Sequence, residues 1–103
     1  MRKYEASAFR ADRAWSGPSL ASIADAVVKL RWTDRPFRWH ANTGPEVFAV
    51  LAGEVDMHMR SSGSPETVVR LAAGDLVCIE AGEEHVAHPI GEARILVIEE
   101  SQG

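Results

Sequence analysis

Short runs of alternating apolar and polar residues, separated by glycine-containing turns, constrain the fold of this chain more than any other feature. In residues 54–60, for example, Val55, Met57 and Met59 share one face of an extended strand, and polar residues occupy the other face. Strands that recur about every 8–12 residues between glycine turns predict an all-β sandwich or barrel. We expect strands over residues 26–32, 46–51, 54–60, 67–71, 76–80, 85–90 and 94–99.

The first residues of the chain differ from the rest. Residues 1–22 show little alternation, and Ser16-Gly17-Pro18-Ser19 interrupts the chain. We predict an N-terminal arm over residues 1–22, with at most one helical turn or an edge strand, and a barrel domain over residues 23–103. Phe9 and Trp15 are expected to dock on this barrel or on a second subunit.

Composition excludes several classes of protein. The chain has 103 residues, which is the size of one domain, and its 46% hydrophobic and 25% charged residues exclude a wholly disordered chain. A net charge of −4 argues against nucleic-acid binding and, more weakly, against anionic membranes. No apolar stretch approaches the length of a membrane span and no signal peptide is visible, so we expect a cytoplasmic protein. Cys78 is the only cysteine, which excludes an intramolecular disulfide.

Four polar residues stand where strand patterning does not require them: His40, Asn42, Glu46 and His85. His40 and Asn42 are two residues apart and face the same side of an extended segment. The turn at residues 43–45 returns Glu46 toward them, while His85 must arrive from another strand. Together they offer two imidazoles, one carboxylate and one amide oxygen. Two histidines and one carboxylate are the ligand set of non-haem Fe(II) sites, and the same set suits Mn, Ni, Co or Zn. The alternative is a polar pocket that binds water or a ligand without metal.

The spacing of these residues resembles the two motifs of the cupin family. His40-x-Asn42-x-x-x-Glu46, followed by Gly53, is similar to the first motif, HxHxxxE and a glycine. The segment from Gly74 through Glu80-x-Gly82-x-x-His85 is similar to the second. The resemblance is to small single-domain cupins of the mannose-6-phosphate-isomerase-like kind. It implies a jelly-roll barrel (double-stranded β-helix) with a divalent metal on His40, Asn42, Glu46 and His85.

The chain departs from the family pattern at two positions that concern the site. Asn42 stands where the family usually has a second histidine. It either binds the metal weakly through its amide oxygen or hydrogen-bonds a metal-bound water. Glu80 replaces the usual proline, and we assign no function to this change.

These features predict a metal-binding cupin that acts on a small polar or anionic molecule, with isomerase or dioxygenase-type chemistry. Glu46 would be the catalytic residue, alternating between metal ligand and general base. The alternative is a non-catalytic ligand-binding or sensor module, which the missing histidine favours. Exposed strand edges predict a homodimer.

Several other side chains have less specific interpretations. We expect His58 on a solvated face, His88 on the face opposite to His85, and Cys78 buried. The sequence does not decide which arginine faces a pocket, nor whether the aromatic residues flanking the first motif line that pocket or fill the core. These residues are Arg31, Arg38 and Arg94, and Trp32, Phe37 and Trp39.

Overall fold

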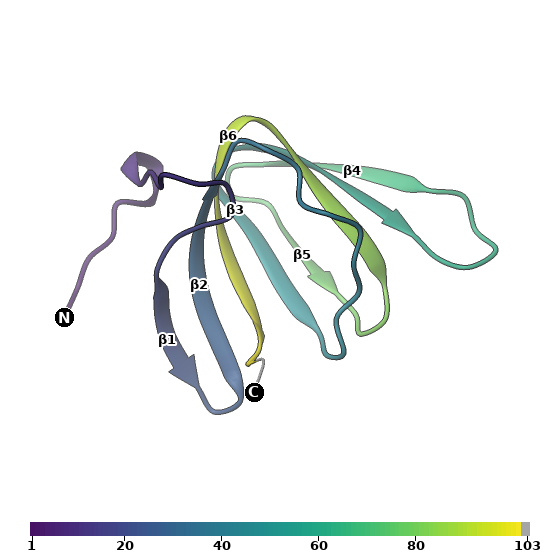
Figure 1. The fold of residues 1–103 in the computed structure, drawn as a ribbon, viewed down its shortest axis with the longest axis horizontal. Coiled ribbons are helices and arrows are strands. Elements are labelled where there is room, and N and C mark those ends of the chain that lie inside the picture. Colours follow the sequence, from purple (N-terminus) through teal and green to yellow (C-terminus); the bar gives the residue numbers. More distant parts are fainter. Residues whose placement is uncertain (102–103) are drawn as a thin grey trace.

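The computed structural model describes residues 1–101 and confirms an all-β protein (Figure 1). Its six strands form one antiparallel sheet in the order β1-β2-β6-β3-β4, and β5 pairs with β3 outside this path. The only helical element in this part of the chain is one turn of 3-10 helix, so none of the described residues forms a helix able to span a membrane. The elements are η1 (Ala6–Ala8), β1 (Ser19–Ile23), β2 (Ala26–Thr33), β3 (Glu46–Arg60), β4 (Thr67–Ala72), β5 (Leu76–Ile79) and β6 (Glu84–Glu100).

Two long, bent strands replace four of the expected short ones. Residues 46–51 and 54–60 belong to one strand, β3, and residues 85–90 and 94–99 belong to β6. The two strands pair along nearly their whole length, with register shifts between Val50 and Glu54 where the sheet bends. Gly53 lies at this bend with φ +82°, and a Cβ there would approach the carbonyl oxygen of Glu92 to 2.3 Å. The glycine read as a turn between strands therefore lets one strand bend tightly against its partner.

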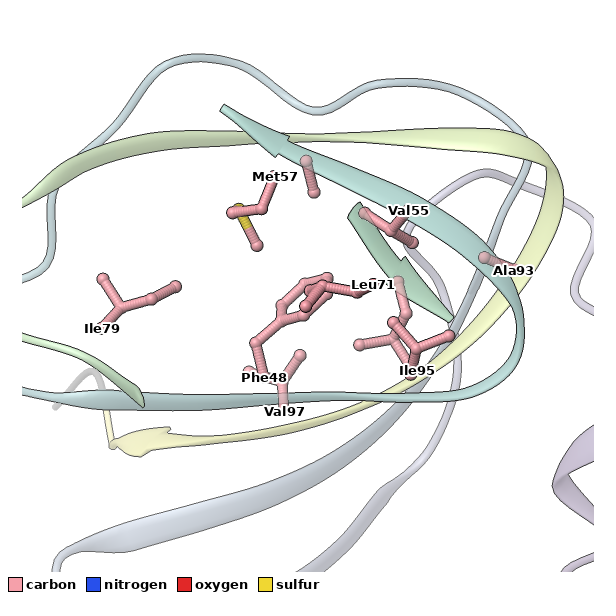
Figure 2. Close-up of a cluster of buried hydrophobic side chains, with 10 residues drawn as sticks. Phe48, Val55, Met57, Leu71, Ile79, Ala93, Ile95 and Val97 are labelled. Atoms are coloured by element: carbon pink, nitrogen blue, oxygen red, sulfur yellow. The ribbon is translucent and has the colours of Figure 1, made fainter. Parts of the chain in front are cut away.

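The main core lies inside the curled sheet, between the two arms of β3 and the two arms of β6 (Figure 2). Phe48 lies near the middle of this cluster and is only 3% exposed. Alternate residues of β3 and β6 point inward, and Val55 and Met57 share the inward face as the period-two pattern predicts. The buried members are Phe48, Val50, Val55, Met57, Leu71, Ile79, Ala87, Ala93, Ile95 and Val97.

The N-terminal residues dock along β2, and residues 15–18 pair with its edge through backbone hydrogen bonds. Trp15 donates its backbone N–H to the carbonyl oxygen of Trp32 at 2.8 Å, and Arg94 donates to the carbonyl oxygen of Phe9 at 2.8 Å. The guanidinium of Arg10 lies 5.3 Å from the ring centroid of Trp32. The N-terminal residues thus dock on the barrel as expected. Because β1 spans the expected boundary at residues 22 and 23, the division into arm and barrel stays a prediction.

The expectation that Cys78 is buried is wrong. Cys78 lies on β5, opposite Val47, and is exposed. Leu76, which shares its face, is 57% exposed. The alternation was interpreted with the correct period but with the wrong face inward.

Candidate metal centre

Backbone pairing brings the two histidines of the site together from distant parts of the chain. His40 and His85 form an isolated antiparallel bridge, in which His40 donates its backbone N–H at 3.1 Å and His85 donates in return at 2.9 Å. The two imidazole rings lie beside each other, with centroids 4.2 Å apart. Such a bridge fixes both Cα positions, so the side chains can converge on one point.

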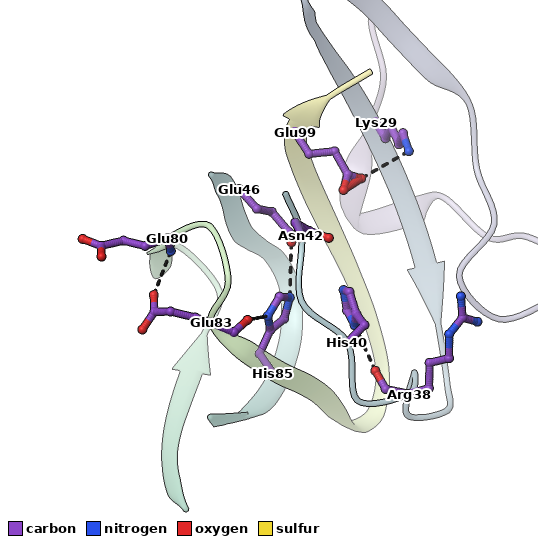
Figure 3. Close-up of polar contacts among 9 residues, drawn as sticks. All are labelled: Lys29, Arg38, His40, Asn42, Glu46, Glu80, Glu83, His85 and Glu99. Carbon is purple, nitrogen blue, oxygen red and sulfur yellow. Dashed lines mark hydrogen bonds and ion pairs between the residues drawn. The ribbon is translucent and has the colours of Figure 1, made fainter. Parts of the chain in front are cut away.

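Each ring is held with the same nitrogen turned toward the site (Figure 3). Nδ1 of His40 lies 2.9 Å from the carbonyl oxygen of Arg38, and Nδ1 of His85 lies 3.0 Å from that of Glu83. A carbonyl oxygen only accepts, so both Nδ1 atoms carry the proton and both Nε2 atoms present a lone pair. Nε2 presentation with Nδ1 bonded to a carbonyl is the arrangement that orients a metal-binding histidine.

Glu46 completes the cluster from the first position of β3. Glu46 is 6% exposed and His85 is 2% exposed, and Oε1 of Glu46 lies 3.3 Å from Nε2 of His85. The ligand atoms of His40, Glu46 and His85 all lie within 4.8 Å of one another. Among the described residues, this is the one group of three or more histidine, cysteine or acidic side chains that close together.

An unsatisfied nitrogen shows that this cluster fits a metal ion. Nε2 of His85 is buried and has no hydrogen-bond partner of acceptable geometry, although Glu46 is close. A buried lone pair without a donor carries a desolvation cost unless a proton or a cation meets it. Burial lowers the pKa of His85, but Glu46 and the carbonyl of Glu83 raise it by more, so its pKa lies above the ordinary value. The same negative environment that attracts a proton also favours a cation.

Asn42 contacts the carboxylate of the cluster through its amide nitrogen. Nδ2 of Asn42 donates to Oε1 of Glu46 at 2.6 Å (Figure 3). An amide nitrogen has no lone pair for a metal, so in this orientation Asn42 positions Glu46. The backbone carbonyl oxygen of Asn42 also accepts the backbone N–H of Gly82 at 2.9 Å, which holds the two motif segments together.

Glu80, the second departure from the family pattern, has a local structural use. Its backbone N–H donates to the carboxylate of Glu83 at 2.7 Å, a bond that a proline could not make. The carbonyl of Glu83 in turn holds the ring of His85. The turn that precedes the second histidine is therefore fixed by a hydrogen bond instead of a proline ring.

The cluster opens into a cavity of about 570 Å³. Trp15 and Phe37 line one part of it, and their rings pack edge to face with centroids 5.5 Å apart. Lys29, Arg31 and Glu99 also line it, and sequence reasoning missed Lys29 and Glu99. The signal for Lys29 was the alternation of β2, in which Lys29 and Arg31 share the face that points into the cavity.

The structure also distinguishes the remaining arginines and aromatic residues. Arg31 and Arg38 line the cavity, whereas Arg94 holds the N-terminal segment on the outside. Phe37 lines the cavity, but Trp32 is buried beneath the N-terminal residues. Trp39 carries the guanidinium of Arg60 above its ring, 4.0 Å from the centroid.

His58 and His88 do not belong to the metal cluster. Their rings lie beside each other on another face of the sheet, with centroids 4.3 Å apart. Nδ1 of His58 lies 3.0 Å from the carboxylate of Glu66. His88 is thus directed away from His85, as the alternation of an extended strand predicts.

Comparison with known families agrees with this fold. The Cupin_2 family, described as a cupin domain, matches residues 30–99. The chain therefore belongs to the cupin family, and the expected cupin-type jelly-roll barrel is confirmed. No curated protein matches the chain.

Solved structures share the fold across most of this chain. A cupin-2 domain protein from Shewanella frigidimarina has a TM-score of 0.77 and 28% identity, covering 87% of this chain and 84% of that one. A hydroquinone 1,2-dioxygenase in complex with Fe³⁺ has a TM-score of 0.80 and 18% identity, covering 90% of this chain and 30% of its own. Oxalate decarboxylase from Bacillus subtilis, described with Mn(II) centres, has a TM-score of 0.67 and 12% identity, covering 75% and 21%. This chain spans less than a third of either enzyme, so both similarities concern the fold alone.

Proposed function

We propose that this cupin binds a divalent transition metal through His40, Glu46 and His85 and uses it to bind a small polar or anionic molecule. The observation that carries the proposal is the buried Nε2 of His85, which lacks a hydrogen bond and faces a carboxylate and a second imidazole. Relatives that hold iron or manganese make these two metals the first candidates, beside Ni, Co and Zn. When bound, such an ion supplies Lewis-acid chemistry or oxygen binding at its open positions.

Residues around the metal would orient its ligands and provide a general base. The carbonyls of Arg38 and Glu83 keep His40 and His85 in the tautomer that presents Nε2. Asn42 holds Oε1 of Glu46, and rotation away from this contact would free Glu46 to take a proton from the bound molecule as general base. Trp15 and Phe37 form an aromatic wall on one side of the cavity. Isomerase and dioxygenase-type reactions both fit this arrangement.

Metal content tests the proposal. The full chain, expressed without a histidine tag and purified without chelator, is expected to carry about one equivalent of metal by elemental analysis. His40→Ala and His85→Ala should lose it while circular dichroism still reports a folded barrel, because the apolar core stabilises the barrel independently of these ligands. His58→Ala, which removes an imidazole outside the cavity, is the matched control and should retain the metal. Metal far below one equivalent in the unmodified chain, even after reconstitution, would overturn the proposal.

A second candidate function is a non-catalytic ligand-binding or sensor module. Asn42 favours it, because this residue stands where cupins usually have a second histidine and because its amide nitrogen already serves Glu46. A chain that binds a small molecule in the cavity without retaining metal would support this candidate over the first. In either case we also propose a homodimer located in the cytoplasm.

A further inference from the structure

Arg31 points into the barrel from β2. It pairs in register with Ile95, a fully buried member of the main core, and it lines the same cavity as the metal cluster. Its neighbours on either side, Leu30 and Trp32, are buried outside that core. A guanidinium at this position is within the cavity and not on the outer surface of the sheet.

The guanidinium of Arg31 is anchored on one side only. Its Nη1 donates to the carbonyl oxygens of Gly17 at 2.7 Å and Leu30 at 3.1 Å. Within residues 1–101, Nε and Nη2 of Arg31 make no hydrogen bond, and no carboxylate lies within 4.0 Å of its guanidinium. Nε and Nη2 form the edge that binds both oxygens of a carboxylate, and Arg70 uses this same edge on Asp56 elsewhere in the protein.

The other cations of the cavity are already engaged. Nζ of Lys29 lies 3.2 Å from the carboxylate of Glu99 (Figure 3). The guanidinium of Arg38 is exposed and lies over the ring of Phe37, 4.7 Å from its centroid. Burial lowers the pKa of Arg31 while Glu99 raises it, yet an arginine stays charged in proteins. Arg31 is thus the cation that lines the cavity with the Nε and Nη2 edge of its guanidinium unused, which suits an anionic group on a ligand.

We infer that Arg31 is the specificity-determining residue of the cavity and binds the carboxylate of a small monocarboxylic acid whose apolar part lies against Trp15 and Phe37. The inference rests on the proposed function, because it takes the cavity of the candidate metal centre as the binding site. To that function it adds a substrate class, small monocarboxylic acids. A carboxylate places its two oxygens against the Nε and Nη2 edge of one guanidinium.

Binding of benzoate, benzamide and phenyl phosphate tests the inference. These probes share a ring for the aromatic wall formed by Trp15 and Phe37 and differ in the polar group attached to it.

Calorimetric titrations use the full chain as purified and after treatment with EDTA, with metal content measured on each sample. Wild type, Arg31→Gln and Arg31→Lys are compared with Arg38→Gln, which removes an exposed positive charge from the rim of the same cavity. Benzoate affinity should fall about 10- to 100-fold in Arg31→Gln and by less in Arg31→Lys. Benzoate affinity should fall less than about 5-fold in Arg38→Gln. Benzamide, which carries no charge, should bind each of these variants with the affinity of wild type.

A measurement on the unmodified chain tests the inference without depending on the folding of the variants. Benzoate should shift the side-chain Nε–H resonance of Arg31 in ¹⁵N-labelled protein, and benzamide should not. Equal losses in Arg31→Gln and Arg38→Gln, tighter binding of phenyl phosphate than benzoate, or an unshifted Arg31 resonance would each overturn the inference. Arg31-dependent benzoate binding in a sample that retains no metal would reject the metal proposal alone. Full metal content without Arg31-dependent binding would reject this inference alone.

Discussion

At the scale of single residues, the chemistry of the site depends on which atom Asn42 presents. Its amide nitrogen donates to Glu46, so removal of the amide should leave the carboxylate free to rotate away from the two histidines. Loss of such an orienting partner costs about 10- to 100-fold in metal affinity. We therefore expect Asn42→Ala to weaken Mn(II) binding within this range in a competition titration, while His58→Ala leaves it unchanged. An unaltered affinity in Asn42→Ala would show that this hydrogen bond does not position the ligand.

The variant Asn42→His separates a positioning role from a place among the ligands. Imidazole is a better ligand than an amide for nickel and zinc, so a side chain within reach of the ion should tighten the binding of both metals. We expect tighter binding, because residue 42 lies on the same extended segment as His40 and already touches Glu46. Equal affinity in wild type and variant would restrict this position to the orientation of Glu46.

The pair formed by Asp56 and Arg70 makes stability depend on pH. The hydrogen bond from Arg70 lowers the pKa of Asp56 more than any other influence. A carboxyl group with a lowered folded-state pKa adds stability above its unfolded pKa of about 3.9 and loses that contribution as the pH falls through the folded value. Asp56→Asn should therefore be less stable than wild type at neutral pH and approach it in acid, by a small margin because the pair is exposed. Urea midpoints across this pH range provide the measurement, with Asp34→Asn as the control. A stability difference that is constant with pH would contradict the assignment.

At the scale of elements, the bend in β3 depends on one glycine. A side chain at residue 53 would combine φ +82° with a Cβ 2.3 Å from the carbonyl oxygen of Glu92. Gly63 has a similar φ of +77° and no atom within 4 Å of the same point, so it measures the backbone term alone. We expect Gly63→Ala to cost about 1 kcal/mol and Gly53→Ala to cost about 3 kcal/mol or more in urea unfolding. Equal costs would mean that the close approach to Glu92 contributes nothing.

The sequence predicted strand positions better than strand boundaries. Alternation correctly placed residues such as Val55 and Met57 on the inward face, because a period of two is a local property. It did not reveal that β3 continues through Gly53, since a glycine between two strands has the same sequence pattern as a glycine at a bend. Only the pairing with β6, which is distant in the sequence, keeps the strand continuous there.

At the scale of the whole molecule, the sequence pattern does not determine which face of a strand points into the barrel. In β2 the apolar face of Leu30 and Trp32 is buried by the N-terminal residues, and the charged face of Lys29 and Arg31 lines the cavity. Alternation separates two faces but cannot tell a core from a covered outer surface when both are buried. The grouping of His40, Glu46 and His85, by contrast, was predictable from motif spacing. The position of Lys29 and Arg31 in the cavity could be recognised only from the closed barrel.

The outer face of the sheet predicts how two copies associate. Across β5, β3 and β6, Leu76 lies opposite Ala49 and Cys78 lies opposite Val47, which forms an outward face of apolar side chains. The face continues through Leu96, Ile98 and Val28. Leu76 is 57% exposed, and contiguous apolar surface of this kind is typical of an interface. A symmetric pair of copies would cover the face, with a second copy supplying the same apolar residues.

We therefore expect sedimentation equilibrium at micromolar concentration to give about twice the chain mass of 11.2 kDa. Leu76→Asp places a charge in this face and should shift the mass toward one chain, because an unpaired charge in an apolar interface is costly. Val68→Asp alters a residue that is equally exposed, at 51%, but lies on β4, away from the apolar face, and should leave the mass unchanged. A wild-type mass near that of one chain would contradict the dimer. A loss of association in Val68→Asp but not in Leu76→Asp would place the interface on β4 instead.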